Sequence, residues 1–480
     1  MRRLGALGAT VALLSLVMAG CGKNSGTVVG GGNKARVSFT IHDNAPLGVT
    51  VLSLQFQVKT AFLQPGNVLI SLPETVELTQ LQTDTAFISS VQVPVNTYTS
   101  LVLDIENPSM TFINNTGGPI TPFMGSTCAA GAVCTFVPAI TQGNIVTFNS
   151  APIFPLALTV AEEVGLELDV DLADLVRSDF SLNFFNTGAM SLTELASVQG
   201  AAELRKLHHA LGTAGTVGVN SFAFTSVTGI PFNVIVDGNT KFLFGAACPA
   251  NAFGCVKAGQ VLELDLSLEG NGTLLAKEVD FEADVNVEEI SGLVVALGAG
   301  SPPTNFQMLV RQASPAAATA AGTFDTITIG AGTAFSVDNH SFVLPAGLTF
   351  TTAANLLVGQ EVLADVTITQ VPAAAITTST IALRRSQVTA LVSTAPTPGG
   401  TTFVLNPLPS LFQTAAPTNI LFLDVDTTAQ TTFEFFTPNT ISGVTLGGNV
   451  SVGGFLFPTG GANTATIAAD EVRSQPIPGP

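Results

Sequence analysis

Four cysteines stand in two close pairs, and cysteine is the residue type in this chain most able to form covalent or metal bonds. Cys128 and Cys134 are separated by five residues, and Cys248 and Cys255 by six. A four-thiolate zinc site typically has about two to four residues between paired ligands. We therefore expect two local disulfides, which form in exported proteins, and zinc is the minor alternative.

The fifth cysteine, Cys21, follows a short apolar run at the start of the chain. Arg2 and Arg3 precede this run, which extends from Leu4 to Val17 and is too short for a good membrane-spanning helix. A positive start followed by such a run is typical of an export signal. The pattern predicts that residues 1–20 are a signal peptide and that the mature protein is exported.

The end of that run resembles the cleavage site of bacterial lipoproteins. Met18-Ala19-Gly20-Cys21 places an aliphatic residue and two small residues before a cysteine, with Met18 in the place of the usual leucine. The resemblance implies cleavage before Cys21, diacylglycerol on its sulfur and acylation of the new amino terminus, which together give stable anchoring. Gly22 in place of aspartate implies the outer membrane, and residues 21–34 are a flexible tether. An ordinary signal peptide with Cys21 in a disulfide is the alternative.

Three acidic residues alternate along one predicted strand. Glu167, Asp169 and Asp171 fall on one face of "EEVGLELDVDLADL", with leucine and valine on the other. Neighbouring carboxylates repel each other, and a Ca²⁺ ion would relieve that repulsion. The sequence lacks the glycine-marked calcium loop, so we favour a solvated sheet face and keep Ca²⁺ as the alternative.

The overall composition restricts the function classes. The net charge is −18 and only 10% of residues are charged, while 46% are hydrophobic. A negative surface repels the phosphate backbone, so we expect no nucleic acid partner. There are 32 Phe but one Tyr and no Trp, which disfavours an open sugar-stacking platform. With no metal-protease, serine-elbow or phosphate-loop motif in a convincing context, we expect no enzyme and no cofactor.

The organisation of the chain predicts an all-β protein. Period-2 alternation in "RVSFTIHD", "VTVLSLQFQVKTAFL" and "VQVPVNTYTSLVLDIEN" indicates strands broken at short intervals by Pro and Gly. We expect an immunoglobulin- or transthyretin-like antiparallel sandwich over residues 35–190. Residues 191–211 contain a capping-box pattern, Ser191 with Glu194, and predict a helical linker.

Three segments of the predicted sandwich resemble the uncharacterised domain-of-unknown-function family 4382 of bacterial lipoproteins. They are "FTIHDNAP" at 39–46, "VELTQL" at 76–81 and "VPVNTYTSLVLDI" at 93–105. The resemblance implies a sandwich domain of an envelope lipoprotein and names no activity.

The second half of the chain contains an internal repeat. A glycine-marked turn followed by a strand occurs as "VKAGQVLELDLSL" at 256–268, "LLVGQEVLADVTI" at 356–368 and "TLGGNVSVGGFLF" at 445–457. A Thr-x-Phe step precedes each copy, ending at Phe242, Phe335 and Phe433. The order of five strands predicts three small barrels of the oligonucleotide/oligosaccharide-binding (OB) type over residues 212–286, 287–387 and 388–475.

These units resemble a second uncharacterised family, domain-of-unknown-function family 5666. The alternation of "LELDLSLE" in the first unit predicts that Glu263, Asp265 and Glu269 point outward. Such a barrel does not identify a function by itself. The sequence therefore predicts a lipid-anchored, non-enzymatic scaffold or binding module with an unknown envelope or extracellular partner. A carbohydrate- or small-ligand-binding lipoprotein and an envelope hydrolase are the alternatives, and the hydrolase requires acidic or histidine side chains with perturbed pKa values clustered in a cleft.

Overall fold

The structure is a computed structural model that describes residues between Lys34 and Gln475, with several gaps. The described segments are residues 34–44, 51–70, 73–80, 86–114, 117–194, 205–226, 231–268, 273–283, 289–313, 319, 321–339, 342–368, 376–414, 419–459, 461 and 463–475. Nearly all regular structure in them is β, as the sequence predicts.

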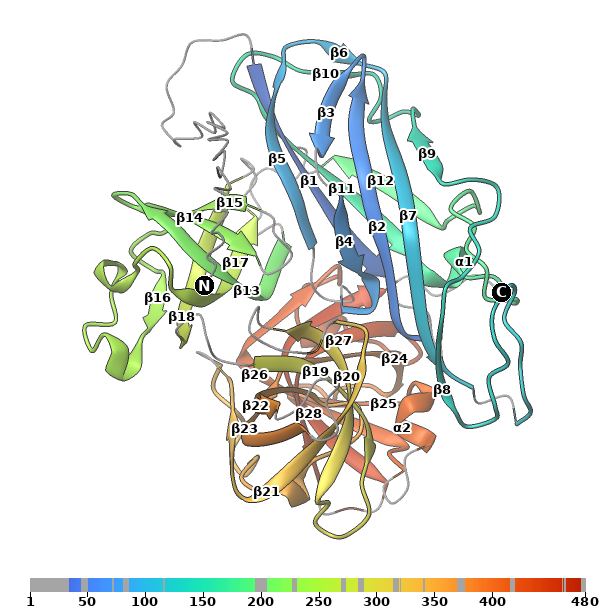
Figure 1. Ribbon diagram of the computed structural model, residues 1–480, viewed down its shortest axis with the longest axis vertical. Helices are drawn as coiled ribbons and strands as arrows, with labels where there is room; N and C mark the ends of the chain where they lie inside the picture. Colours follow the sequence, from blue (N-terminus) through green and yellow to red (C-terminus); the bar gives the residue numbers. More distant parts are fainter. Residues whose placement is uncertain are drawn as a thin grey trace, which may run out of the picture. The chain divides into compact units, whose positions relative to one another are not determined.

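Two sheets form the first domain (Figure 1). The first sheet has the order β12-β11-β1-β5, with bounds β1 Lys34–Asn44, β5 Ala86–Pro94, β11 Glu163–Asp171 and β12 Met190–Glu194. The second has the order β3-β2-β7-β8, with β4 on β2 and β9 on β7; the bounds are β2 Val51–Gln64, β3 Asn67–Ile70, β4 Glu74–Glu77, β7 Ser100–Ile113, β8 Val133–Phe136 and β9 Ile145–Phe148. Short pieces complete the domain: β6 Thr97–Tyr98, β10 Leu156–Ala157, the 3₁₀ turn η1 Leu78–Gln80 and the helix α1 Leu172–Leu175.

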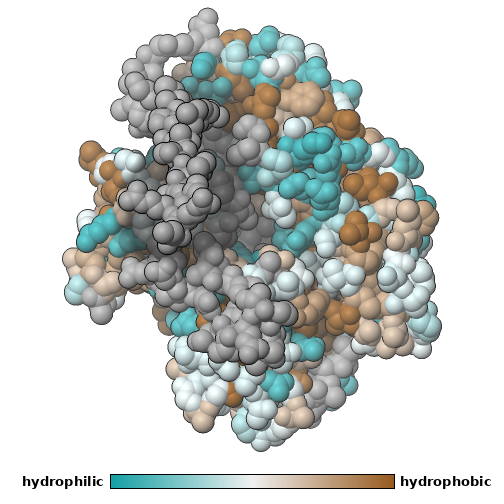
Figure 2. Space-filling view, in the orientation of Figure 1, coloured by the Kyte–Doolittle hydropathy of each residue, from teal (hydrophilic) through white to brown (hydrophobic). Residues whose placement is uncertain are grey.

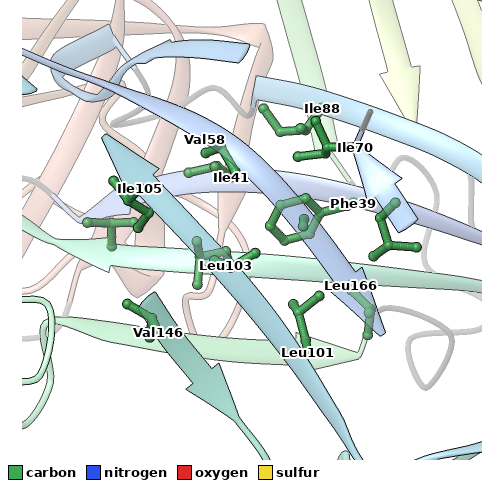
Figure 3. Close-up of a cluster of buried hydrophobic side chains, with 14 of the residues drawn as sticks. Phe39, Ile41, Val58, Ile70, Ile88, Leu101, Leu103, Ile105, Val146 and Leu166 are labelled. Atoms are coloured by element: carbon green, nitrogen blue, oxygen red, sulfur yellow. The ribbon is translucent and has the colours of Figure 1, made fainter. Parts of the chain in front are cut away.

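The alternating apolar residues of both sheets meet in one core (Figure 3). Phe39 and Ile41 of β1 lie among Leu101 and Leu103 of β7, and all four side chains are fully buried. Burying each such side chain contributes about 1.5–3 kcal/mol. Tyr98, the single tyrosine, is also buried, and its hydroxyl accepts a hydrogen bond from Asn67 and donates one to the carbonyl of residue 94. The sandwich prediction is confirmed.

One strand pair departs from the antiparallel expectation. β1 pairs with β11 in parallel, with Val37 opposite Val164 and Ile41 opposite Leu168, while β5 runs antiparallel on its other side. Hairpin connection forces neighbouring strands to be antiparallel, but β1 and β11 are separated by a long stretch of chain, so their relative direction is free.

The first barrel is a six-stranded sheet in the order β15-β14-β13-β17-β18-β16, closed by a parallel pairing of β15 with β18. Its elements are β13 Arg205–Val217, β14 Ser221–Ser226, β15 Pro231–Ile235, β16 Lys241–Leu243, β17 Val261–Leu268 and β18 Leu274–Ala283, with 3₁₀ turns η3 Gly245–Ala247 and η4 Phe253–Cys255. Its first strand begins at residue 205, before the predicted boundary at 212.

The second and third barrels are closed and have the same strand order. The second is β19-β20-β21-β23-β22, with β19 Glu289–Leu297, β20 Asn305–Ala313, β21 Phe324–Val337, η5 Ala353–Asn355, β22 Glu361–Ile368 and β23 Ile376–Arg384. The third is β24-β25-β26-β28-β27, with β24 Ser386–Thr394, β25 Thr402–Leu405, α2 Ser410–Thr414, β26 Phe422–Glu434, η6 Ile441–Gly443, β27 Asn449–Pro458 and β28 Thr464–Gln475. In each, the third and fifth strands pair in parallel. Three OB-like barrels are therefore confirmed.

The predicted helical linker over residues 191–211 is wrong at both described ends. Ser191 and Glu194 lie in β12 and pair with β11, and residues 205–211 belong to β13, which pairs with β14 and β17. Local capping chemistry is a weak preference, and pairing with a buried neighbouring strand overrides it. Residues 195–204 lie outside the described residues.

Candidate functional site: a buried arginine and its carboxylates

The recurring residues of the three barrels hold the fold together. The threonine of each Thr-x-Phe step donates its hydroxyl to a carbonyl on the last strand of its own barrel: Thr240 to Ala276 at 2.7 Å, Thr333 to Thr378 at 2.9 Å and Thr431 to Ala469 at 2.6 Å. The same hydroxyl accepts the backbone N–H three residues earlier in each copy. This repeated pattern is thus a structural clamp.

The glycine-marked turn is equally structural. Its glycine has a positive φ of +88° at Gly259, +92° at Gly359 and +76° at Gly447, a conformation that side chains disfavour. In each copy the glycine donates its N–H to the first strand of its barrel, at residues 214, 294 and 392. Gln260 and Gln360 then accept a backbone N–H at 2.7 Å each, and the third copy has glycine in that place.

The most concentrated chemistry in the described residues surrounds Arg384, the last residue of β23. Its side chain is 5% exposed and binds Glu263 of β17, whose side chain is fully buried. Its Nε lies 3.2 Å from Oδ2 of Asp338, which follows β21, and its Nη2 lies 3.9 Å from Oε1 of Glu282 on β18. Arg384 therefore joins strands of the first barrel to the second barrel.

The position of Glu263 corrects the sequence prediction. Alternation assigned Glu263, Asp265 and Glu269 to an outward, solvated face, but Glu263 is 1% exposed and Asp265 is half-buried. Seven of the eight residues of the strand are buried, so it has no solvated face, and Glu263 is paired there with Arg384 of another barrel. Glu269 lies outside the described residues.

Burial and mutual repulsion shift the pKa values of this cluster. Burial, followed by the charge of Glu263, raises the pKa of Glu282 to about 9, although Arg384 acts in the opposite direction. Burial, followed by the charge of Asp365, raises the pKa of Glu289, the first residue of β19, to about 7. Burial alone lowers the pKa of Arg384, but the surrounding carboxylates outweigh it, so the pKa is raised and the guanidinium stays charged.

The arrangement can hold a proton between two carboxyl groups. Glu282 and Glu289 are hydrogen-bonded to each other, and a neutral carboxyl can donate to an ionised one. A general acid needs the same raised pKa, but it must also reach a substrate. The side chain of Glu282 is only 11% exposed, so the pair is placed to stabilise or loosen the contact between the barrels.

A second buried cluster surrounds Arg385 inside the third barrel. Its Nε lies 2.9 and 2.8 Å from the two carboxylate oxygens of Asp470, and its Nη2 lies 3.2 Å from Glu471. Glu471 also binds Arg473, which in turn binds Glu434. These groups are paired with each other within one barrel.

A third contact joins the sandwich to the second barrel. Arg311 of β20 donates to the hydroxyl of Thr79 at 3.0 Å and to the carbonyl of Leu52 at 3.2 Å, and its Nε lies 2.9 Å from Glu361. Apolar residues of β2, β7, β19, β20 and α2 form a buried cluster with Leu52. Charged hydrogen bonds and apolar burial therefore act together here.

The three carboxylates considered for Ca²⁺ have other surroundings. Asp171 is the N-cap of α1 and accepts N–H groups from Ala173 at 2.8 Å and Asp174 at 3.4 Å. Burial raises the pKa of Asp171, and these two hydrogen bonds oppose the shift. Glu167 is 2% exposed, so the prediction of a solvated face is wrong there, and Asp169 is half-buried. Among the residues that the structure describes, no group of three or more His, Cys, Asp or Glu side chains could hold a metal ion.

Both predicted disulfides are present. Cys128 is bonded to Cys134 and Cys248 to Cys255. The first follows β7 and ends in β8, and the second brackets η4 ahead of the glycine-marked turn.

The predicted lipidation site Cys21 and the predicted signal peptide lie outside the described residues. Within the described part of the chain, no helix is long and apolar enough to cross a membrane.

Sequence reasoning missed the cluster around Arg384 because its members come from five strands and one loop. A usable signal was present: Glu263 interrupts an apolar strand, and the pair Arg384-Arg385 directly follows another. A charge at the end of a buried strand needs a partner of opposite charge. The partner of Arg384, Glu263, is 121 residues away in the sequence, so the sequence alone does not identify it.

Comparison of the chain with protein-family models and with curated proteins finds no match.

Proposed function

We propose that this chain is a lipid-anchored protein of the bacterial cell envelope, attached through Cys21 at the outer membrane, and that it acts as a non-enzymatic scaffold or binding module. The observation that carries the scaffold role is the use of buried charges between domains. Arg384 binds Glu263 of the preceding barrel, and Arg311 binds the sandwich at Thr79. Breaking a buried ion pair is costly, so such contacts favour a chain that presents several domains as one body.

Further observations support the same proposal. The cysteines of the described residues are held in two disulfides, which fits an oxidising compartment. Figure 2 shows hydrophobic and hydrophilic residues interspersed in small groups over the visible face. Exposed apolar residues such as Met124, at 83%, and Val137, at 67%, offer contact points for a partner on the sandwich.

The anchor is tested by metabolic labelling with a palmitate analogue and by membrane fractionation. We expect the wild-type chain to incorporate the label and to pellet with outer membranes, and Cys21→Ser to do neither. A pull-down from native envelope, comparing the two forms, tests the binding role. An unlabelled wild-type chain contradicts the anchor, and recovery of a glycan in place of a protein supports the carbohydrate-binding alternative.

We infer an envelope hydrolase as the second candidate, because one observation favours it. Glu282 and Glu289 form a carboxyl pair with raised pKa values of about 9 and about 7. Such pairs serve as acid and base in hydrolases when a substrate can reach them, and the side chain of Glu282 is 11% exposed. The test is hydrolysis of chromogenic glycosides and esters by the whole chain and by Glu282→Gln. Activity that the substitution abolishes supports this candidate, and an inactive wild-type chain ends it.

A further inference from the structure

The connection between the first and second barrels passes through the cluster around Arg384. β18 ends at Ala283 and β19 begins at Glu289, so Glu282 and Glu289 stand on either side of the short connecting segment. Oε1 of Glu282 lies 3.9 Å from Nη2 of Arg384, and Glu289 is buried within range of the charges of Asp365, Arg384 and Glu263. Any change in their charge therefore acts where the two barrels meet.

Acidic groups outnumber the guanidinium among the described members of this cluster. The charged and titratable groups that act on the pair are Glu263 of β17, Asp338 after β21, Asp365 of β22 and Arg384 of β23. In addition, Glu361 lies opposite Arg384 in the pairing of β22 with β23, and it also binds Arg311. Two further negative charges at Glu282 and Glu289 would lie close to existing ones in a water-poor space, where repulsion is strong.

We propose that the contact between the first and second barrels is controlled by protons: Glu282 and Glu289 keep it closed while they are protonated and loosen it when both ionise. Ionisation should loosen the contact and not tighten it, because Arg384 already binds Glu263 and Asp338. Its remaining approach to Glu282 is long, at 3.9 Å. A newly ionised Glu282 therefore gains little from Arg384 and adds repulsion against Glu263.

The sign of the pH dependence follows from linkage. Glu282 and Glu289 bind protons more tightly in the closed form than when exposed to water, where the usual pKa is 4.5. Raising the pH therefore favours the open form. Between pH 7 and 9 only Glu282 still holds its proton in the closed form, so the open population rises about tenfold per pH unit. Between pH 5 and 7 both carboxyls contribute and the dependence is steeper.

Hydrogen exchange of the whole chain tests this proposal. Amide protection in β17, corrected for the intrinsic pH dependence of exchange, is measured from pH 6 to 9. We expect it to fall about tenfold per pH unit above pH 7 in the wild type and to become flat in Glu282→Gln. The equivalent strand of the third barrel, β27, is the internal control and keeps its protection.

Two further variants keep the test decisive. Glu289→Gln lowers the slope below pH 7 to that of a single carboxyl and retains the slope above pH 7, so this variant also serves if Glu282→Gln does not fold by circular dichroism. Glu106→Gln removes an exposed carboxylate of the sandwich that binds Lys59 at 2.6 Å, and it leaves the slope of β17 unchanged. The proposal is overturned if amide protection in β17 of the wild type does not depend on pH. It is also overturned if Glu289→Gln has the same pH dependence as the wild type below pH 7.

Discussion

Replacement of Arg384 by methionine tests the energetic role of the buried ion pair. Methionine preserves most of the aliphatic volume but leaves Glu263, with a fully buried side chain, without its guanidinium. Removing one partner of a buried pair costs about 3–5 kcal/mol, whereas a solvent-exposed pair contributes about 1 kcal/mol or less. Because the side chains of Arg384 and Glu263 are 5% and 0% exposed, the larger range applies to Arg384→Met.

The matched control is Lys59→Met. Lys59 binds Glu106 at 2.6 Å, but the two side chains are 46% and 34% exposed, so we expect a loss of less than about 1 kcal/mol. The double variant Arg384→Met with Glu263→Gln also removes the buried carboxylate charge that Arg384 contacts, and we expect it to be more stable than Arg384→Met alone.

Urea unfolding at pH 7 followed by far-ultraviolet circular dichroism measures these effects. Fluorescence is unsuitable because the chain has no Trp and a single Tyr. Several domains unfold in one experiment, so the first transition is compared between variants and the slope m must stay constant. The reasoning is refuted if Arg384→Met is no more destabilised than Lys59→Met, or if the double variant is less stable than Arg384→Met.

Three other substitutions give separate tests. Burial raises the pKa of Glu74 to about 7, so stability falls as pH rises from about 4.5 to 7. Glu74→Gln should lose this dependence, which is worth about 2–3 kcal/mol between pH 5 and 8. Thermal melts at the two pH values measure it, and an unchanged dependence in the variant contradicts the prediction. A Cβ at Gly453 would clash with the guanidinium of Arg385, so Gly453→Ala should cost about 1–3 kcal/mol in urea unfolding. An unchanged free energy of unfolding would mean that the guanidinium can move aside, and it contradicts the prediction. Thr333→Val removes the hydrogen bond from Thr333 to β23 and should lower the free energy of unfolding by about 1–2 kcal/mol. We expect amide protection against hydrogen exchange to be lost first in the second barrel. A uniform loss of protection across the chain would contradict a local clamp.

The sequence predicts those features that depend on local pattern. Alternation identified the strands of the sandwich, and Val37, Phe39 and Ile41 are buried as expected. The glycine-marked turn located three barrels because a positive φ restricts the residue that can stand there. Short spacing limited the possible cysteine partners, so the pairings Cys128–Cys134 and Cys248–Cys255 could be named.

Features that depend on distant contacts escaped prediction. The alternation of its strand predicts that Glu263 points outward, but Glu263 is buried and pairs with Arg384, which comes from another barrel 121 residues later. The segment around Ser191 has helix-capping residues, but the neighbouring strand β11 offers it a paired edge. A single sequence shows the structural preference of each segment, but it does not show which distant segment will cover that segment in the fold.

The position of β1 also determines how the domain responds to tension. β1 begins at Lys34, directly after the predicted tether, and it is hydrogen-bonded on one side to β5 and on the other to β11. A pull on the amino terminus acts along this strand, so both ladders must shear at once and cannot open one bond at a time. Forced unfolding is governed by the unfolding rate. A protein held by its amino terminus against flow would therefore carry the load on the most extensively paired strand of its first sheet.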